Sequence, residues 1–187
     1  MKSCERLPDG YNLIRSIDLL KNKKEALIVN VISLILFVLF FIPGQMYVPV
    51  TELLFSGDVV QLAALLLFQF IYIAAHEAVH GIFMKCYLKN SKLKFGYKLI
   101  YAYAGSDGYF CKKHYIIIAL APLVILGILL LAVNLILKET FFWPVYFVQL
   151  LNISGAAGDL YVFNIMRKMP SDILVNDTGI AMSVYAK

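Results

Sequence analysis

Long apolar runs separated by short polar segments dominate the chain. The runs cover residues 26–42, 59–84, 115–137 and 141–166. Each is about as long as the α-helix that crosses the hydrocarbon core of a bilayer. The pattern therefore predicts an all-α integral membrane protein with four transmembrane helices, folded as a single membrane-embedded domain over residues 1–187.

Composition and charge agree with a membrane location. Hydrophobic residues make up 61% of the chain, and the mean hydropathy is +0.77. The formal net charge of +5 would suit nucleic acid, but its placement favours a membrane. All basic residues except Lys138 lie in the head before residue 26, in the segment 85–114 or after residue 166. With four spans these regions share one side, which the positive-inside rule makes the cytoplasm. We expect a multi-pass protein of the cytoplasmic membrane with both termini in the cytoplasm. The lipid bilayer is the expected partner of the positive charge, and nucleic acid is not.

The segment 76–80, His-Glu-Ala-Val-His, is the most informative stretch of the sequence. On an α-helix, His76 and His80 are one turn apart on the same face, so both imidazoles can reach one metal ion. Glu77 lies about 100° around the helix from His76, near enough to meet a metal-bound water. This H-E-x-x-H spacing is typical of zinc metallopeptidases, in which the two histidines bind Zn²⁺ and the glutamate is the general base.

A third ligand is expected because a catalytic zinc takes three protein ligands and leaves one position open. Besides Glu77, Asp159 is the acidic residue inside the predicted spans. At 1.5 Å per residue, His76 and Asp159 each lie roughly 12–14 Å from the basic flank of their helix. Antiparallel second and fourth helices would bring them to one level, so we predict Asp159 as the third ligand. Asp107 and His114, from the cytoplasmic loop 85–114, remain alternatives because the loop could fold inward.

These residues carry a resemblance to known families. The His-Glu-x-x-His motif in a membrane helix, with an aspartate in a later helix, resembles the site-2 protease type of intramembrane metalloprotease. More closely, the chain resembles a family of small bacterial membrane proteins described as zincin peptidases. The matching segments are residues 76–81 (HEAVHG), 121–123 (APL) and 154–160 (SGAAGDL). The resemblance implies a zinc-dependent, membrane-embedded peptidase with His76, His80 and Asp159 as ligands and Glu77 as base. In site-2 proteases the aspartate stands in an Asn-x-x-Pro-x-x-x-Leu-Asp-Gly context, whereas here Leu160 follows Asp159 and the proline is missing.

Residues 92–103 alternate polar and apolar side chains and are rich in β-favouring types. We expect a short cytoplasmic β-hairpin there, between the second and third helices. Such a hairpin could pair with an unwound substrate by adding a strand to its edge, or it could lie on lipid headgroups.

Asn152 is a further polar residue inside the fourth predicted span, seven residues before Asp159. It could stabilise an oxyanion or orient a metal ligand. The alternative is that it only holds helices together.

The sequence thus predicts a membrane-embedded zinc metallopeptidase. It would hydrolyse peptide bonds of membrane or membrane-proximal protein and peptide substrates, using zinc-bound water activated by Glu77. The alternative is a non-catalytic membrane protein that binds metal, or one that acts as a scaffold or regulator.

Overall fold

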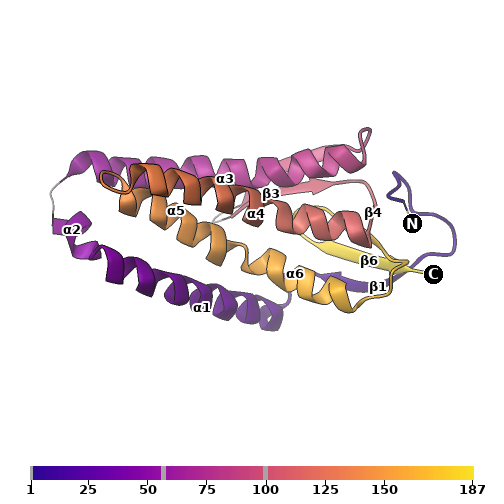
Figure 1. Cartoon of the computed structure of the whole chain (residues 1–187). Helices are drawn as coiled ribbons and strands as arrows, with labels where there is room; N and C mark the ends of the chain where they lie inside the picture. Colours follow the sequence, from indigo (N-terminus) through magenta and orange to yellow (C-terminus); the bar gives the residue numbers. More distant parts are fainter. Residues whose placement is uncertain (1, 56–57, 99–100) are drawn as a thin grey trace. The chain divides into compact units, whose positions relative to one another are not determined.

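The computed structural model of the chain describes residues 2–55, 58–98 and 101–187. Figure 1 shows the helices and strands of the chain. The chain divides into two compact units, which we describe separately. The first comprises Met1–Ile28, Glu77–Ala121 and Asp159–Lys187, and the second comprises Val29–His76 and Pro122–Gly158. The segments of each unit are far apart in the sequence, so each unit is built by non-local packing.

The first unit contains a four-stranded antiparallel sheet with the strand order β1-β6-β5-β4. The strands are β1 (Asn12–Ile17), β4 (Phe110–Cys111), β5 (Leu174–Asp177) and β6 (Met182–Ala186). β1 pairs with β6, with a register shift between Leu13 and Arg15. This pairing puts the two terminal segments of the chain in the same sheet.

A second sheet in the same unit consists of β2 (Leu93–Lys98) and β3 (Tyr101–Ser106). They pair antiparallel, from Leu93 opposite Ser106 to Lys98 opposite Tyr101. This pair occupies the segment where a hairpin is predicted; residues 99–100 of that prediction lie outside the described residues. The Asn176 amide donates to the Ser106 and Gly108 carbonyls, at 3.2 and 2.9 Å, and so ties the pair to β5.

The core of the first unit lies between the four-stranded sheet and the helical segments packed on it. Its fully buried side chains come from both, and include Met84, Ile118, Met166, Val175 and Val184. The buried residues of β6 are Met182 and Val184, two positions apart, which is the period-2 pattern of a strand with one face in the core.

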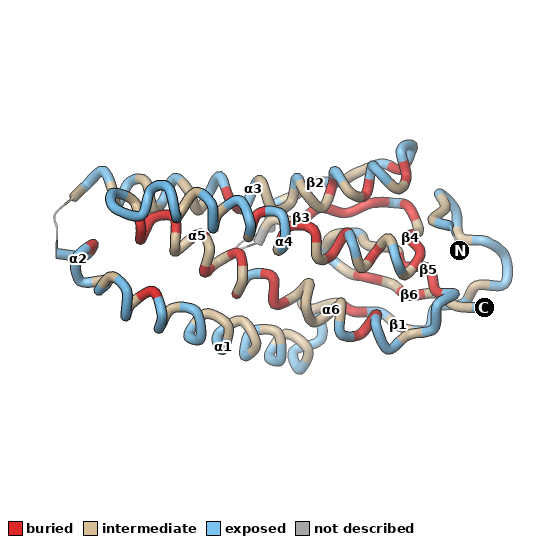
Figure 2. The backbone as a smooth tube through the Cα atoms, viewed as in Figure 1, coloured by how far each residue is buried: buried red, intermediate tan, exposed pale blue. Residues whose placement is uncertain are grey.

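The helices are α1 (Lys23–Tyr47), α2 (Val50–Phe55), α3 (Val59–Tyr87), α4 (Lys112–Leu137), α5 (Phe142–Gly155) and α6 (Ala157–Lys168). Within the described residues, α1, α3 and α4 are long and apolar enough to cross a membrane, judged by length and composition. The most apolar window of α1 contains no buried residue (Figure 2). Apolar side chains that the protein leaves uncovered are suited to contact with lipid, and the three helices support a membrane protein.

The prediction of an all-α protein with four transmembrane helices is wrong. Six strands form two antiparallel sheets in the described parts of the chain. The predicted span 141–166 is two helices of 14 and 12 residues separated at Ala156, and each is shorter than the roughly 20 residues that a spanning helix needs. The Gly-Ala-Ala-Gly run at 155–158 favours this break, because glycine lowers helix propensity.

The second unit has its own apolar cluster, formed by Leu53, Phe142 and Trp143. Here α1 continues past the predicted end at residue 42 and includes Pro43. The Tyr146 hydroxyl donates to the Phe40 carbonyl at 2.6 Å, which gives a partner to a carbonyl in the turn that the proline disturbs.

Candidate metal centre

The His-Glu-Ala-Val-His segment lies inside α3 and is helical throughout. The 3.6-residue period therefore puts His76 and His80 on one face, as the sequence predicts. Both histidines are half-buried. The boundary between the two units falls between His76 and Glu77, within this continuous helix.

Asp159 is the third residue of α6 and lies in its first turn. The break at Ala156 starts a new helix just before the aspartate, which therefore lies at the positive end of the helix dipole. A carboxylate is stabilised at such a position.

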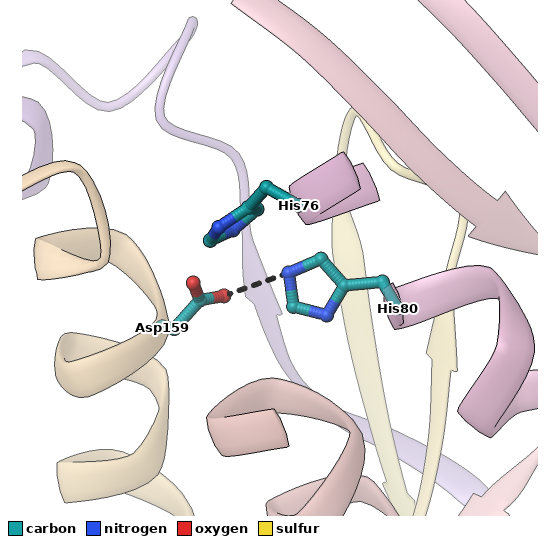
Figure 3. Close-up of side chains that lie close together, drawn as sticks. All are labelled: His76, His80 and Asp159. Carbon is teal, nitrogen blue, oxygen red and sulfur yellow. Dashed lines mark ion pairs between the residues drawn. The ribbon is translucent and has the colours of Figure 1, made fainter. Parts of the chain in front are cut away.

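The side chains of His76, His80 and Asp159 converge (Figure 3). One potential ligand atom from each lies within 4.8 Å of the other two. His80 Nε2 is 3.6 Å from Asp159 Oδ1, and both of these residues belong to the first unit. Their side chains are 12% and 23% exposed, so the group is sheltered without being sealed from water.

The orientation of His80 follows from a proline in α4. Pro122 has no N–H, so the carbonyl of Ile118, four residues earlier, has no partner within the helix. His80 Nδ1 lies 2.9 Å from that carbonyl oxygen. A carbonyl can only accept, so Nδ1 carries a hydrogen, and Nε2, on the side of Asp159, is the nitrogen that can bind a metal.

His76 is held at the same ring position by a different group. The hydroxyl of Tyr72, one turn earlier on α3, lies 3.0 Å from His76 Nδ1. Tyr72 is buried, and its ring meets the imidazole edge to face. Both imidazoles are therefore engaged through Nδ1.

Two imidazoles and one carboxylate are a ligand set typical of catalytic zinc. Two atoms that each bind one zinc ion at about 2.0–2.1 Å can be at most about 4.2 Å apart. The distance of 3.6 Å between His80 and Asp159 meets that limit, and the 4.8 Å bound on the whole group requires only a small side-chain adjustment. The residues present therefore fit a zinc ion.

The other predicted residues take different positions. Glu77 follows His76 on α3 and is half-buried. The carboxylate of Asp107, an alternative ligand, instead accepts the backbone N–H of Lys92 at 2.8 Å. The ring of His114, the second alternative, stacks on Tyr87 and lies 2.7 Å from the Ser3 hydroxyl.

The β2–β3 pair lies against the metal-binding helix. A Cβ atom added at Gly81, the residue after His80, would be only 2.4 Å from the Phe95 ring of β2. The small residue at position 81 therefore lets β2 approach α3 beside the motif. The outer edge of β2 pairs with no other strand among the described residues.

Sequence reasoning missed three groups around the site. Tyr72 and the Ile118 carbonyl have sequence signals, because Tyr72 precedes His76 by four residues and Ile118 precedes Pro122 by four. Asp177 on β5 has none. Its carboxylate accepts hydrogen bonds from the Tyr115 hydroxyl (2.5 Å) and the Gly179 N–H (2.8 Å). Burial raises the pKa of Asp177, and these two hydrogen bonds and nearby His80 offset part of the rise.

Comparison with known proteins supplies a family. The model of the family described as "Putative zincin peptidase" matches residues 69–174. This range holds all three converging side chains and covers more than half of the chain. Neither the curated proteins nor the solved structures give a significant match.

Proposed function

The chain belongs to the zincin peptidase family, and this membership supports its assignment as a zinc-dependent protease. We propose that it is a membrane-embedded zinc metallopeptidase. Its substrates are membrane proteins or membrane-proximal peptides, and its ligands are His76, His80 and Asp159. The observation that carries the proposal is the convergence of these three side chains. Glu77 follows the first of them, His76, on α3.

The mechanism assigns one task to each residue. A bound zinc ion supplies a Lewis acid that makes water more acidic and polarises the scissile carbonyl. Glu77 takes a proton from the attacking water as its oxygen bonds to the carbonyl carbon. When the C–N bond breaks, Glu77 returns that proton to the leaving amine nitrogen. Asp159 contributes a negative charge that balances part of the charge of the cation.

The edge of β2 supplies a place for the substrate. A peptide bond inside a helix is shielded by the helix, so a membrane substrate has to unwind before it can be cut. An unwound segment can add to the outer edge of β2 as another strand, held by main-chain hydrogen bonds. β2 lies against Gly81, one residue after His80, so this strand would lie close to the metal ligands.

The proposed location is the cytoplasmic membrane, with the four-stranded sheet on the cytoplasmic side. The pairing of β1 with β6 supports a common side of the bilayer for the two terminal segments, because strands of one sheet outside the membrane share a side. Lys21, Lys23 and Lys24 immediately before or at the start of α1, and Lys112 and Lys113 at the start of α4, favour the cytoplasm for that side.

The test compares wild type with Glu77→Gln, His80→Ala and Asp159→Ala, each purified in detergent. Elemental analysis should find zinc in wild type and in Glu77→Gln, and much less in the two ligand variants. Membranes from cells that produce each form are then compared by mass spectrometry for new peptide ends. New ends should appear with wild type alone.

Two results would contradict the proposal in different ways. Zinc in wild type with the same peptide ends in wild type and Glu77→Gln would leave a metal-binding protein without peptidase activity. Absence of zinc from wild type would reject the metal centre itself and leave a scaffold or regulatory role.

A further inference from the structure

We propose that Tyr72 and Asn152 are positioning residues that fix His76 in one tautomer, with Nδ1 protonated and Nε2 as the metal-binding nitrogen. The proposal deepens the proposed function, on which it rests for the identity of His76 as a ligand. It assigns a role to the most deeply buried amide of the second unit.

A continuous series of hydrogen bonds within the second unit connects these residues. The Asn152 amide nitrogen donates to the Leu123 carbonyl at 3.1 Å. The Tyr72 hydroxyl donates to the Asn152 amide oxygen at 3.4 Å. The same hydroxyl lies 3.0 Å from His76 Nδ1. This series of hydrogen bonds runs from a backbone carbonyl of α4, through Asn152 of α5, to the candidate ligand His76 on α3.

The direction of these hydrogen bonds is set by the carbonyl at the far end. The Leu123 oxygen can only accept, so Asn152 must direct its nitrogen there and its oxygen to Tyr72. An amide oxygen also only accepts, so the Tyr72 proton points to Asn152. The hydroxyl oxygen then accepts from His76, which requires hydrogen on His76 Nδ1 and makes Nε2 the unprotonated nitrogen of the neutral ring.

Because Asn152 and Tyr72 are buried, water does not offer them alternative hydrogen-bond partners, and the donor–acceptor direction is kept. Asn152 is 0% exposed and Tyr72 is 9% exposed. The backbone of α4 is shaped for the amide, because a Cβ atom added at Gly127 would be 3.1 Å from Asn152 Nδ2, tighter than most real contacts. A buried amide with both ends bonded has no low-cost alternative orientation.

Helix–helix adhesion alone does not account for this arrangement. Tyr146 is an example of a hydrogen bond that only joins two helices of the same unit, because its hydroxyl donates to the Phe40 carbonyl. The hydrogen bonds of Tyr72 and Asn152 instead end at the His76 imidazole, which has two neutral tautomers. They produce at His76 the same outcome that the Ile118 carbonyl produces at His80, so both rings present Nε2.

The first test reads the tautomer directly in metal-free protein. Nitrogen-15 NMR of histidine-labelled protein, at a pH where the rings are neutral, distinguishes Nδ1–H from Nε2–H. The chain has 3 histidines, so replacing each in turn assigns the signals. Wild-type His76 should be protonated at Nδ1. In Asn152→Leu the Tyr72 proton has lost its acceptor and turns to His76, which should shift the ring to Nε2–H. Asn152→Asp keeps an acceptor oxygen and should keep the wild-type tautomer.

The second test measures Zn²⁺ affinity in Tyr72→Phe, with Tyr146→Phe as the matched control. Both variants lose one hydroxyl from the second unit, so a purely structural effect should be similar in the two. Loss of an outer-sphere partner weakens metal binding about tenfold to a hundredfold, and we expect this for Tyr72→Phe alone. Tyr146→Phe should stay within about twofold of wild type.

The inference is overturned if the His76 tautomer is the same in wild type and Asn152→Leu, or if the two tyrosine variants bind Zn²⁺ equally well. Failure of the proposed function is a separate result. If wild type binds no zinc, the peptidase proposal falls, while the tautomer measurement still decides whether Tyr72 and Asn152 orient His76.

Discussion

The role of Pro122 leads to a prediction in which protein stability and metal affinity change in opposite directions. Pro122→Ala restores an N–H that points at the Ile118 carbonyl, where it competes with His80 Nδ1 for the same oxygen. His80 then loses part of the bond that fixes its Nε2 lone pair for the metal. At the same time the helix gains a hydrogen bond and loses a ring clash.

The two effects can be sized separately. A neutral hydrogen bond contributes about 0.5–1.5 kcal/mol, which corresponds to Zn²⁺ binding roughly twofold to tenfold weaker. This is an upper range, because a carbonyl has two lone pairs and can accept from both donors. For stability, alanine is more favourable than proline in a helix interior by up to about 3 kcal/mol. Pro122→Ala should therefore unfold at a higher temperature in the absence of metal.

The matched control is Pro43→Ala, which removes the other proline found inside a long helix. It should raise stability without changing Zn²⁺ affinity. Affinity is measured by competition with a fluorescent zinc chelator in detergent, and stability by thermal unfolding of metal-free protein. Equal Zn²⁺ affinity in Pro122→Ala and wild type would refute the assignment of the Ile118 carbonyl as the group that orients His80.

Three further predictions follow from the site. Removal of metal with EDTA should lower the unfolding temperature of wild type, and Zn²⁺ at 100 times its Kd should restore about 2.7 kcal/mol; an unchanged unfolding temperature would argue against a folded-state metal site. Gly81→Ala should push the Phe95 ring away from α3 and lower peptide cleavage more than Zn²⁺ content, as measured by the appearance of new peptide ends; equal losses of both would mean that β2 does not hold substrate. Because burial raises the pKa of Asp177 above its ordinary value of 3.8, the folded state keeps that proton to higher pH than the unfolded state does. Metal-free stability should therefore fall as pH rises from about 4 through the folded pKa, and Asp177→Asn should flatten this fall in thermal unfolding measured across that range; an identical slope in both proteins would contradict it.

The sequence by itself determined the features that depend on helix period and length. The spacing of His76 and His80 places them on one face of any helix that contains them, and α3 is such a helix. Counting the helical rise from the basic flanks gave only a common depth for Asp159 and the pair. The prediction that Asp159 lies near the pair also assumed that the two helices are antiparallel neighbours, which the period of neither helix determines.

Tertiary structure decided which distant segments meet. The pairing of β1 with β6 joins residues at opposite ends of the chain, and β4 has only two residues, too few to show an alternating pattern. The partners of the imidazoles are of the same kind. The Ile118 carbonyl and the Asn152 amide act through contacts with residues 29 or more positions away. A local pattern records the period of one element, whereas the direction of a hydrogen bond between two elements is fixed only when packing brings them together.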